Sequence, residues 1–183
     1  MGPTQIVRTG SQYLTFQLAG EEYALDIMQV REIIEYGTLT HVPQTPPSIR
    51  GVINLRGNVV PVIDLALQFS ATPSPITGRT CIIIGEANLE GEPAVVGVVA
   101  DAVSKVVELT DDEILPTPAF GTGVRVDYLH GMGRAGAKFL LLLDLDKVLS
   151  NVELKAGSTV HSMVGPSQSG KAAQAISDGE TNC

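Results

Sequence analysis

The chain contains an internal repeat, and this repeat constrains the fold more than any other feature of the sequence. Each half carries an aspartate, a β-prone tetrapeptide, a proline-rich loop, a glycine and, thirteen residues after the glycine, an Asp-Leu pair. In the first half these are Asp26, Val30-Arg31-Glu32-Ile33, Gly51 and Asp64-Leu65, and in the second half they are Asp101, Val106-Val107-Glu108-Leu109, Gly131 and Asp144-Leu145. The offset of roughly 75 to 80 residues indicates a duplicated structural unit.

Each repeated unit has the length of about five short strands, and composition supports that assignment. Hydrophobic residues make up 44% of the chain, aromatic residues only 4%, and tryptophan is absent, so the core must consist mainly of Val, Ile and Leu. Branched aliphatic side chains favour strands. Because five short strands close most economically as a small barrel, the sequence predicts an all-β fold of two five-stranded barrels with a cleft between them.

The order of the segments predicts the boundaries of these barrels. Residues 13–18 alternate polar and apolar side chains, as a half-buried strand does, and residues 28–34 read as a strand with one irregular turn. We expect a first barrel over residues 12–70, a linker rich in Pro, Thr and Ser over 70–79, and a second barrel over 80–150, with a wide hairpin loop at 86–93. Residues 1–11 are expected to be flexible, and residues 151–183 to form a short helix followed by a disordered tail.

Charge and cysteine content exclude several classes of function. The net charge is -8, and no run of Lys and Arg offers a surface to nucleic acid. No apolar run reaches the roughly 20 residues that span a bilayer, so direct membrane insertion is not expected. The two cysteines, Cys81 and Cys183, lie far apart and predict no disulfide framework. These features indicate a cytoplasmic protein without a cofactor.

One motif suggests an enzyme and is discounted. The sequence Gly131-Met132-Gly133-Arg134-Ala135-Gly136 matches the dinucleotide-binding pattern G-x-G-x-x-G. That pattern needs a helix immediately after it to present free N–H groups to a pyrophosphate, whereas residues 138–145 read as a buried strand. The favoured interpretation is a glycine-rich hairpin, and a nucleotide-binding enzyme is kept as a rival hypothesis.

The remaining polar residues predict neither a metal site nor an active site. His41, His130 and His161 lie far apart, with no carboxylate or cysteine at ligand spacing. The aspartates at 26, 64, 101 and 144 stand beside apolar runs, where a catalytic role would be conceivable. Their recurrence at matching places in both repeats instead predicts hydrogen bonds to backbone N–H groups that fasten each barrel.

The hairpin Asn54-Leu55-Arg56-Gly57 differs in kind from the other turns. Its glycine can supply the positive φ of a tight turn, and its arginine would be held at the surface between two apolar strands. A guanidinium in that place can bind a partner carboxylate through two parallel hydrogen bonds. On composition alone, a docking role and an ordinary solvated arginine are equally supported.

Taken together, several motifs resemble the CheW family of chemotaxis coupling proteins over about residues 12–150. In the first half they are Glu22-Tyr23-Ala24-Leu25-Asp26-Ile27, Val30-Arg31-Glu32-Ile33, Thr45-Pro46-Pro47-Ser48-Ile49-Arg50-Gly51-Val52-Ile53-Asn54-Leu55-Arg56-Gly57 and Val60-Pro61-Val62-Ile63-Asp64-Leu65. In the second half they are Val98-Val99-Ala100-Asp101-Ala102-Val103-Ser104, Leu115-Pro116-Thr117-Pro118-Ala119-Phe120 and Tyr128-Leu129-His130-Gly131-Met132-Gly133. The resemblance implies two SH3-like barrels and a non-catalytic role that links chemoreceptors to the histidine kinase CheA.

The resemblance also implies which residues meet each partner. The cytoplasmic tip of a receptor would dock in a groove between the barrels, against Val30, Glu32, Ile33, Arg56 and Val103. The regulatory domain of CheA would contact the barrel ends, against Leu39, Arg50, Gly51 and Phe120. Leu115 stands where some relatives carry a basic residue, a departure from the family pattern.

Recruitment to receptor arrays at the inner membrane would follow from these contacts. A scaffold of the same family that serves another chemosensory pathway, such as non-flagellar motility, remains the nearer alternative. The sequence leaves open which receptors or pathway the protein serves.

Overall fold

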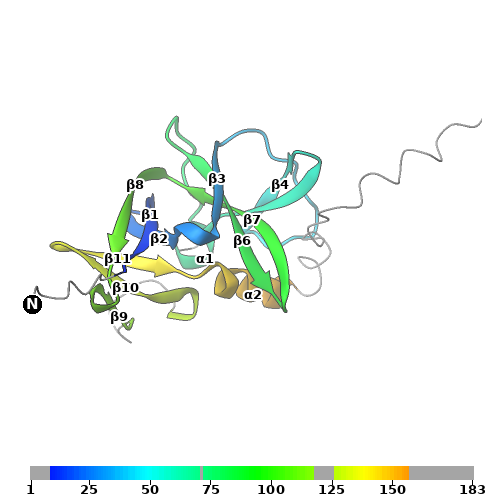
Figure 1. The fold of residues 1–183 in the computed structure, drawn as a ribbon. Coiled ribbons are helices and arrows are strands. Elements are labelled where there is room, and N and C mark those ends of the chain that lie inside the picture. The colour runs from blue at the N-terminus through cyan, green and yellow to red at the C-terminus, as the bar shows by residue number, and fades with distance from the viewer. Residues whose placement is uncertain (1–8, 71, 118–125, 157–183) are drawn as a thin grey trace, which may run out of the picture.

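The computed structural model describes residues 9–70, 72–117 and 126–156, which form two curled β-sheets (Figure 1). The first sheet contains, in spatial order, β8 (Ala102–Leu109), β1 (Ser11–Leu18), β2 (Glu21–Asp26), β11 (Lys138–Leu143), β10 (Leu129–Ala135) and β9 (Ile114–Leu115). The second contains β3 (Val30–Glu35), β6 (Cys81–Leu89), β7 (Glu92–Ala100), β5 (Asn58–Ile63) and β4 (Ile49–Leu55). The prediction of an all-β fold with two barrel-like halves is confirmed.

Short helical segments connect these strands. They are η1 (Ile27–Gln29), α1 (Leu65–Ser70), η2 (Asp111–Glu113), η3 (Val126–Tyr128) and α2 (Leu145–Ala156). The irregular turn expected near residue 28 is η1, and the helix expected near the end of the second barrel is α2, which already begins at Leu145. The predictions for the flexible N-terminus and the disordered tail fall mainly on residues 1–8 and 157–183, outside the described residues.

Each sheet contains a hairpin from the other half of the chain. The hairpin β1–β2 pairs with β8 and β11 of the second half, and the hairpin β6–β7 pairs with β3 and β5 of the first half. With this exchange, both sheets have the same strand pattern. The expected division into a barrel of residues 12–70 and a barrel of residues 80–150 is therefore corrected, because the periodicity of a strand identifies the strand but not its neighbour.

Both exchanged hairpins close with tight two-residue turns. Ala19 and Gly20 have φ values of 51° and 82°, and Glu90 and Gly91 have φ values of 52° and 90°. Two successive positive φ values are typical of turns that match the right-handed twist of paired strands. The wide loop expected at residues 86–93 is wrong, because β6 runs to Leu89 and β7 starts at Glu92.

The largest hydrophobic cluster lies between the two sheets. It joins side chains of the first sheet, such as Phe16 and Leu25, to side chains of the second, such as Ile83 and Val98, all fully buried. Smaller clusters fill the interior of each curled sheet. Because the shared cluster is the largest, the two barrels are packed against each other as one unit.

An aromatic stack runs through that shared cluster. The ring of Phe16 stacks on Tyr23 at 5.9 Å, Tyr23 stacks on Phe69 of α1 at 5.8 Å, and Phe69 meets Tyr128 edge-on at 5.3 Å. Such pairs stabilise a core beyond their buried area. The stack connects both halves of the chain through α1.

The four repeated aspartates accept hydrogen bonds from backbone N–H groups, as predicted. The donors are Met28 for Asp26 (2.9 Å), Ala66 and Ser74 for Asp64 (3.0 and 2.9 Å), Ala19 for Asp101 (3.0 Å), and Asp146 for Asp144 (3.0 Å). Each bond fixes a place where a strand ends and a turn or helix begins. The aspartates are therefore structural.

The glycine-rich motif at residues 131–136 lies in strand β10 and the turn that follows it. The next element is strand β11, not the helix whose N-terminus the dinucleotide-binding pattern requires. Gly131 has a packing role, because a Cβ there would lie 2.8 Å from the carbonyl oxygen of Leu115. The interpretation as a dinucleotide-binding loop is wrong.

Candidate protein-docking surface

An ion pair links strand β3 to the β4–β5 turn. Arg56 donates a hydrogen bond from Nη2 to Oε2 of Glu32 at 3.2 Å. The Arg56 side chain is 79% exposed and that of Glu32 29% exposed, so the pair lies at the surface. Two residues that the family resemblance assigned to one partner are thus in direct contact, although 24 residues separate them.

The turn that carries Arg56 has a fixed geometry. Arg56 has a φ of 53° and Gly57 a φ of 87°, and the backbone N–H of Gly57 donates to Oδ1 of Asn54 at 2.8 Å. Left-handed backbone is unfavourable for a residue with a Cβ, so Arg56 tolerates strain that glycine in its place would relieve. Ala19 and Glu90 have nearly the same φ in the other tight turns, so this geometry fixes the place of the Arg56 side chain but does not by itself indicate a function.

A bulge in β3 determines which face of the sheet each side chain occupies. The pairing of β3 with β6 shifts register between Val30 and Glu32, which leaves Arg31 without a partner residue in the ladder. Val30 packs at the margin of the cluster between the sheets, and Ile33 remains 44% exposed. Because the bulge changes the alternation, Val30 and Ile33 lie on one face of β3, while Glu32 lies on the other face and contacts Arg56.

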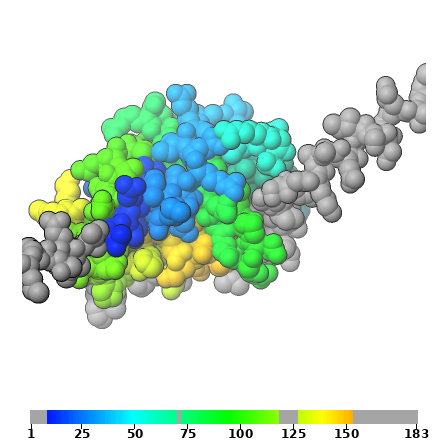
Figure 2. Space-filling model, in the orientation of Figure 1, coloured from blue at the N-terminus to red at the C-terminus, as the bar shows by residue number. Residues whose placement is uncertain are grey.

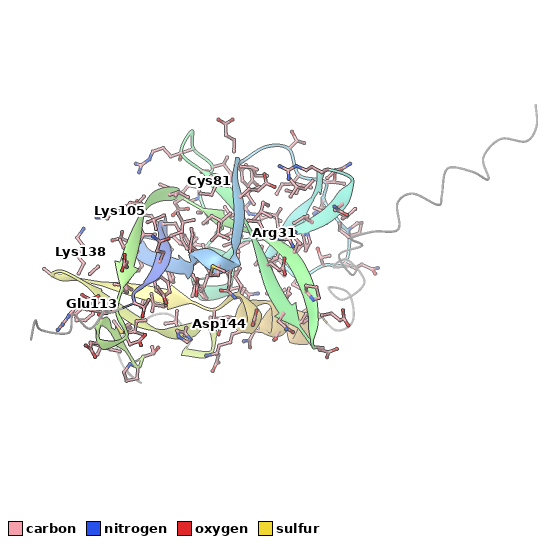
Figure 3. The ribbon with its side chains drawn as sticks, viewed as in Figure 1. Arg31, Cys81, Lys105, Glu113, Lys138 and Asp144 are labelled. Atoms are coloured by element: carbon pink, nitrogen blue, oxygen red, sulfur yellow. The ribbon has the colours of Figure 1, made fainter. Side chains whose placement is uncertain are left out.

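Val103 lies near the Glu35 end of β3. It is the second residue of β8 and packs at the margin of the same cluster as Val30. Its backbone forms a hydrogen bond to the thiol of Cys81, and Cys81 pairs with Glu35, the last residue of β3. Figure 3 shows Cys81 between the upper end of β3 and β8. The five residues assigned to the receptor thus lie along β3 from end to end.

The second half of the chain lacks this ion pair. The turn between β10 and β11 has Gly136 where the first half has Arg56, and strand β8 presents Val107, which packs with Ala135 on the cluster inside its own sheet. The two barrels share their strand pattern but not this surface. An asymmetric surface is what a partner-specific site requires.

Three of the residues assigned to the kinase lie together at the β4 edge. Thr40 and Val52 exchange backbone hydrogen bonds, and Leu39 packs on the cluster inside the second sheet. Gly51 has a φ of 152°, and a Cβ there would lie 2.5 Å from the carbonyl oxygen of Thr40. Glycine at 51 therefore allows the preceding loop to close against β4.

Arg50 is engaged inside the protein. It donates from Nε to the buried carboxylate of Asp64 and from Nη2 to the carbonyl oxygen of Ser74, both at 2.9 Å. Its side chain is only 25% exposed. The geometry gives Arg50 a structural role, and any contact with a partner would use its remaining exposed edge. Phe120, the fourth of these residues, lies outside the described residues.

Among residues 9–70, 72–117 and 126–156, no group of His, Cys, Asp and Glu is arranged to hold a metal ion. In the same ranges, no helix is both long and apolar enough to cross a membrane. Burial raises the pKa of Cys81, which disfavours the reactive thiolate.

Sequence reasoning missed two features beside the groove. Met28, on η1, is 87% exposed, and Arg31 forms an ion pair with Glu86 of β6. The exposure of Met28 could have been predicted from the sequence. Ile27 and Val30 are three residues apart, so in a helical turn both face inward and Met28 faces outward. The second depends on the bulge, which the sequence pattern does not reveal.

The sequence matches a known protein family over most of its length. The model of the CheW-like domain matches residues 12–153. This chain belongs to the CheW-like domain family. The chemotaxis protein CheW of Klebsiella aerogenes is 40% identical over 145 residues, which cover 79% of this chain and 85% of that protein. The CheW of Treponema pallidum is 31% identical over 144 residues, with the same shares covered.

Two further similarities bear on function and fold. Protein FrzA of Myxococcus xanthus is 30% identical over 151 residues, covering 81% of this chain and 91% of FrzA. Among solved structures, the scaffolding protein CheW of Thermoanaerobacter tengcongensis superposes with a TM-score of 0.69 at 29% identity, covering 81% of this chain and 94% of that chain. The architecture of this CheW-family chain therefore agrees with an experimental structure of the family.

Proposed function

We propose that this protein is a non-enzymatic scaffold that couples chemoreceptors to the histidine kinase CheA. The observation that carries the proposal is the contact between Glu32 and Arg56 beside Val30 and Ile33, on an exposed edge strand of a CheW-family fold. An apolar groove with one charged pair at its rim suits an amphipathic helix, which supplies apolar anchors and a polar flank. The receptor tip is the proposed occupant.

The kinase contact belongs to the barrel ends. The Thr40–Val52 bridge and the close approach at Gly51 hold Leu39 at one end of the second sheet. Phe120 would serve the other end, as a single large aromatic anchor. With separate surfaces for the two partners, one molecule can hold both at once, and the protein would act in the cytoplasm at receptor arrays of the inner membrane.

Co-sedimentation with receptor-bearing membranes, with and without kinase, tests the proposal. Wild-type protein should sediment with the membranes and should bring the kinase with it. The Arg56→Glu protein should no longer sediment with the membranes but should still bind the kinase in solution. The Phe120→Ala protein should still sediment with the membranes but should no longer bind the kinase. The proposal fails if neither variant weakens any partner, or if both weaken the same partner equally.

A scaffold of another chemosensory pathway is the second candidate. Protein FrzA is 30% identical to this chain but is not named CheW. Membership of the family therefore does not decide which pathway this protein serves. The genes beside this one would discriminate. Neighbouring receptor and kinase genes of a flagellar system support the first candidate, and those of another motility system support the second.

A further inference from the structure

An open pocket adjoins the start of β3 at Arg31, and none of the residues assigned to the receptor lines it. The pocket has a volume of about 350 Å³ and lies where η1, β6, β7 and the start of α2 meet. Its walls include the apolar residues Met28, Ala87 and Pro93 and the charged residues Arg31, Glu86 and Asp146. Figure 2 shows this face, with β3 and its preceding turn in blue, bordered by the green of β6 and the orange of α2.

Met28 is held outward by a rigid turn. Its backbone N–H donates to Oδ1 of Asp26 at 2.9 Å, and the N–H of Val30 closes the turn on the carbonyl oxygen of Ile27. Ile27 packs at the margin of the central cluster, which anchors the turn from below. An apolar side chain that is 87% exposed on such a fixed turn is preorganised for contact, and a thioether adapts to partner side chains of different shape.

The charges of the pocket select the chemistry of its occupant. Arg31 is paired with Glu86, and Figure 3 shows Arg31 beside β6. Asp146 accepts the backbone N–H of Asn88 at 2.7 Å through Oδ1, and within the described residues its Oδ2 accepts no hydrogen bond. The lining therefore carries one negative charge in excess, with one carboxylate oxygen free for a cation.

The dimensions of the surface match a helix. Strand β3 has six residues, which at about 3.3 Å each extend over roughly 20 Å. At 1.5 Å per residue, about 13 helical residues cover that length. An apolar residue over Met28 and a basic residue one turn away, near Asp146, lie on the same face of such a helix.

We propose that Met28 and Asp146 form a second anchor point for the receptor helix that lies along β3, where Met28 receives an apolar side chain and Asp146 a Lys or Arg. This inference rests on the proposed function, and it names the chemistry that the receptor must present. The proposed docking surface then extends beyond the five residues that the family resemblance assigns to the receptor.

Titration of the full chain with a purified cytoplasmic receptor fragment tests the inference. Met28→Asp should weaken binding about tenfold or more, since it places a charge in an apolar contact. Asp146→Asn keeps the Oδ1 acceptor for Asn88, and it should weaken binding by a few fold and reduce the dependence of affinity on salt. Phe139→Asp is the matched control, because Phe139 is also exposed and apolar but lies in β11 of the other sheet.

The outcomes separate this inference from the proposed function. If the wild type and the Phe139→Asp protein bind and Met28→Asp binds equally well, the second anchor point does not exist while receptor coupling stands. If the wild type does not bind the fragment, both ideas are overturned. Thermal unfolding of each variant checks folding: because Met28 is exposed, Met28→Asp should unfold at the wild-type temperature, and a loss of binding is then a loss of contact.

Discussion

Arg50 donates to the buried carboxylate of Asp64 at 2.9 Å, whereas Lys147 approaches Asp144, the equivalent aspartate of the second half, only to 4.0 Å. Asp64 is fully buried and also accepts from the hydroxyl of Ser74. The first half thus fastens its barrel with a dense polar network. In the second half, the aspartate at the equivalent place has a looser and more exposed pair, with a lysine from helix α2 instead of an arginine from a strand.

Removing Arg50 should destabilise the protein strongly. Arg50→Ala leaves a buried carboxylate without its cation, which costs about 3 kcal/mol of the free energy of unfolding. Lys147→Ala should cost about 0.5 kcal/mol, because its pair is solvent-exposed. Urea denaturation of both variants measures the difference, and equal effects would contradict the structural role given to Arg50.

Arg56→Gly should separate stability from binding. Glycine relieves the left-handed backbone at 56, as Gly136 does at the equivalent turn, so the variant should be as stable as the wild type or more stable by up to about 1 kcal/mol. The same variant loses the guanidinium and should bind receptor membranes less well. Thermal unfolding and co-sedimentation measured on one preparation test both statements, and a large drop in melting temperature would show that the turn has another role.

Gly51→Ala should disturb the β4 edge. The new Cβ would lie 2.5 Å from the carbonyl oxygen of Thr40 at a φ of 152°, so the loop before β4 must move. A loss of about 2 kcal/mol or more in the free energy of unfolding is expected, together with weaker kinase binding. Gly37→Ala is the control, since nothing lies within 4 Å of a Cβ at that position.

The two halves of the chain should not fold alone. A fragment of residues 9–78 lacks β6 and β7, which form the middle of its sheet, and a fragment of residues 79–156 lacks β1 and β2. Each fragment should show poorly dispersed amide resonances by itself, and mixing the two should restore the dispersion. A stable fold of either fragment alone would contradict the hairpin exchange.

Cys81 should react slowly with thiol reagents at neutral pH. Burial raises the pKa of Cys81 above its ordinary value of 9.0, so the thiolate needed for reaction is scarce until the pH exceeds that value. As the pH rises, the Cys81 thiol loses its proton in the unfolded chain before it does so in the folded protein. The free energy of unfolding should therefore decrease as the pH rises above about 9. Labelling rates of a Cys183→Ser protein between pH 7 and 10 measure the shift, and bound receptor fragment should slow them further.

The sequence predicted well what depends on local pattern. Alternation located the strands, and the recurrence of Asp26, Asp64, Asp101 and Asp144 predicted their bonds to backbone N–H groups. It also assigned Glu32 and Arg56 to one surface, through the family resemblance, and the two side chains are in contact.

What depends on pairing between distant segments was not predictable from pattern. Nothing in the alternation of residues 13–18 indicates that β1 pairs with β8 rather than with a strand of its own half. For the same reason the ion pair of Arg50 with Asp64, 14 residues further along the chain, was not predictable, and the contact of Arg50 with the kinase stays a prediction. The tight turn at Glu90 was missed because a left-handed glutamate has no sequence signature.

The hairpin exchange has a mechanical consequence. The chain crosses from one sheet to the other at η1, after Asp26, and again at Asp101, before Val103. These two crossings lie at the two ends of β3. A helix docked along β3, as proposed, would touch both crossings, and a change in its tilt would then act as a torque between the sheets, against the stacked rings of Tyr23 and Phe69.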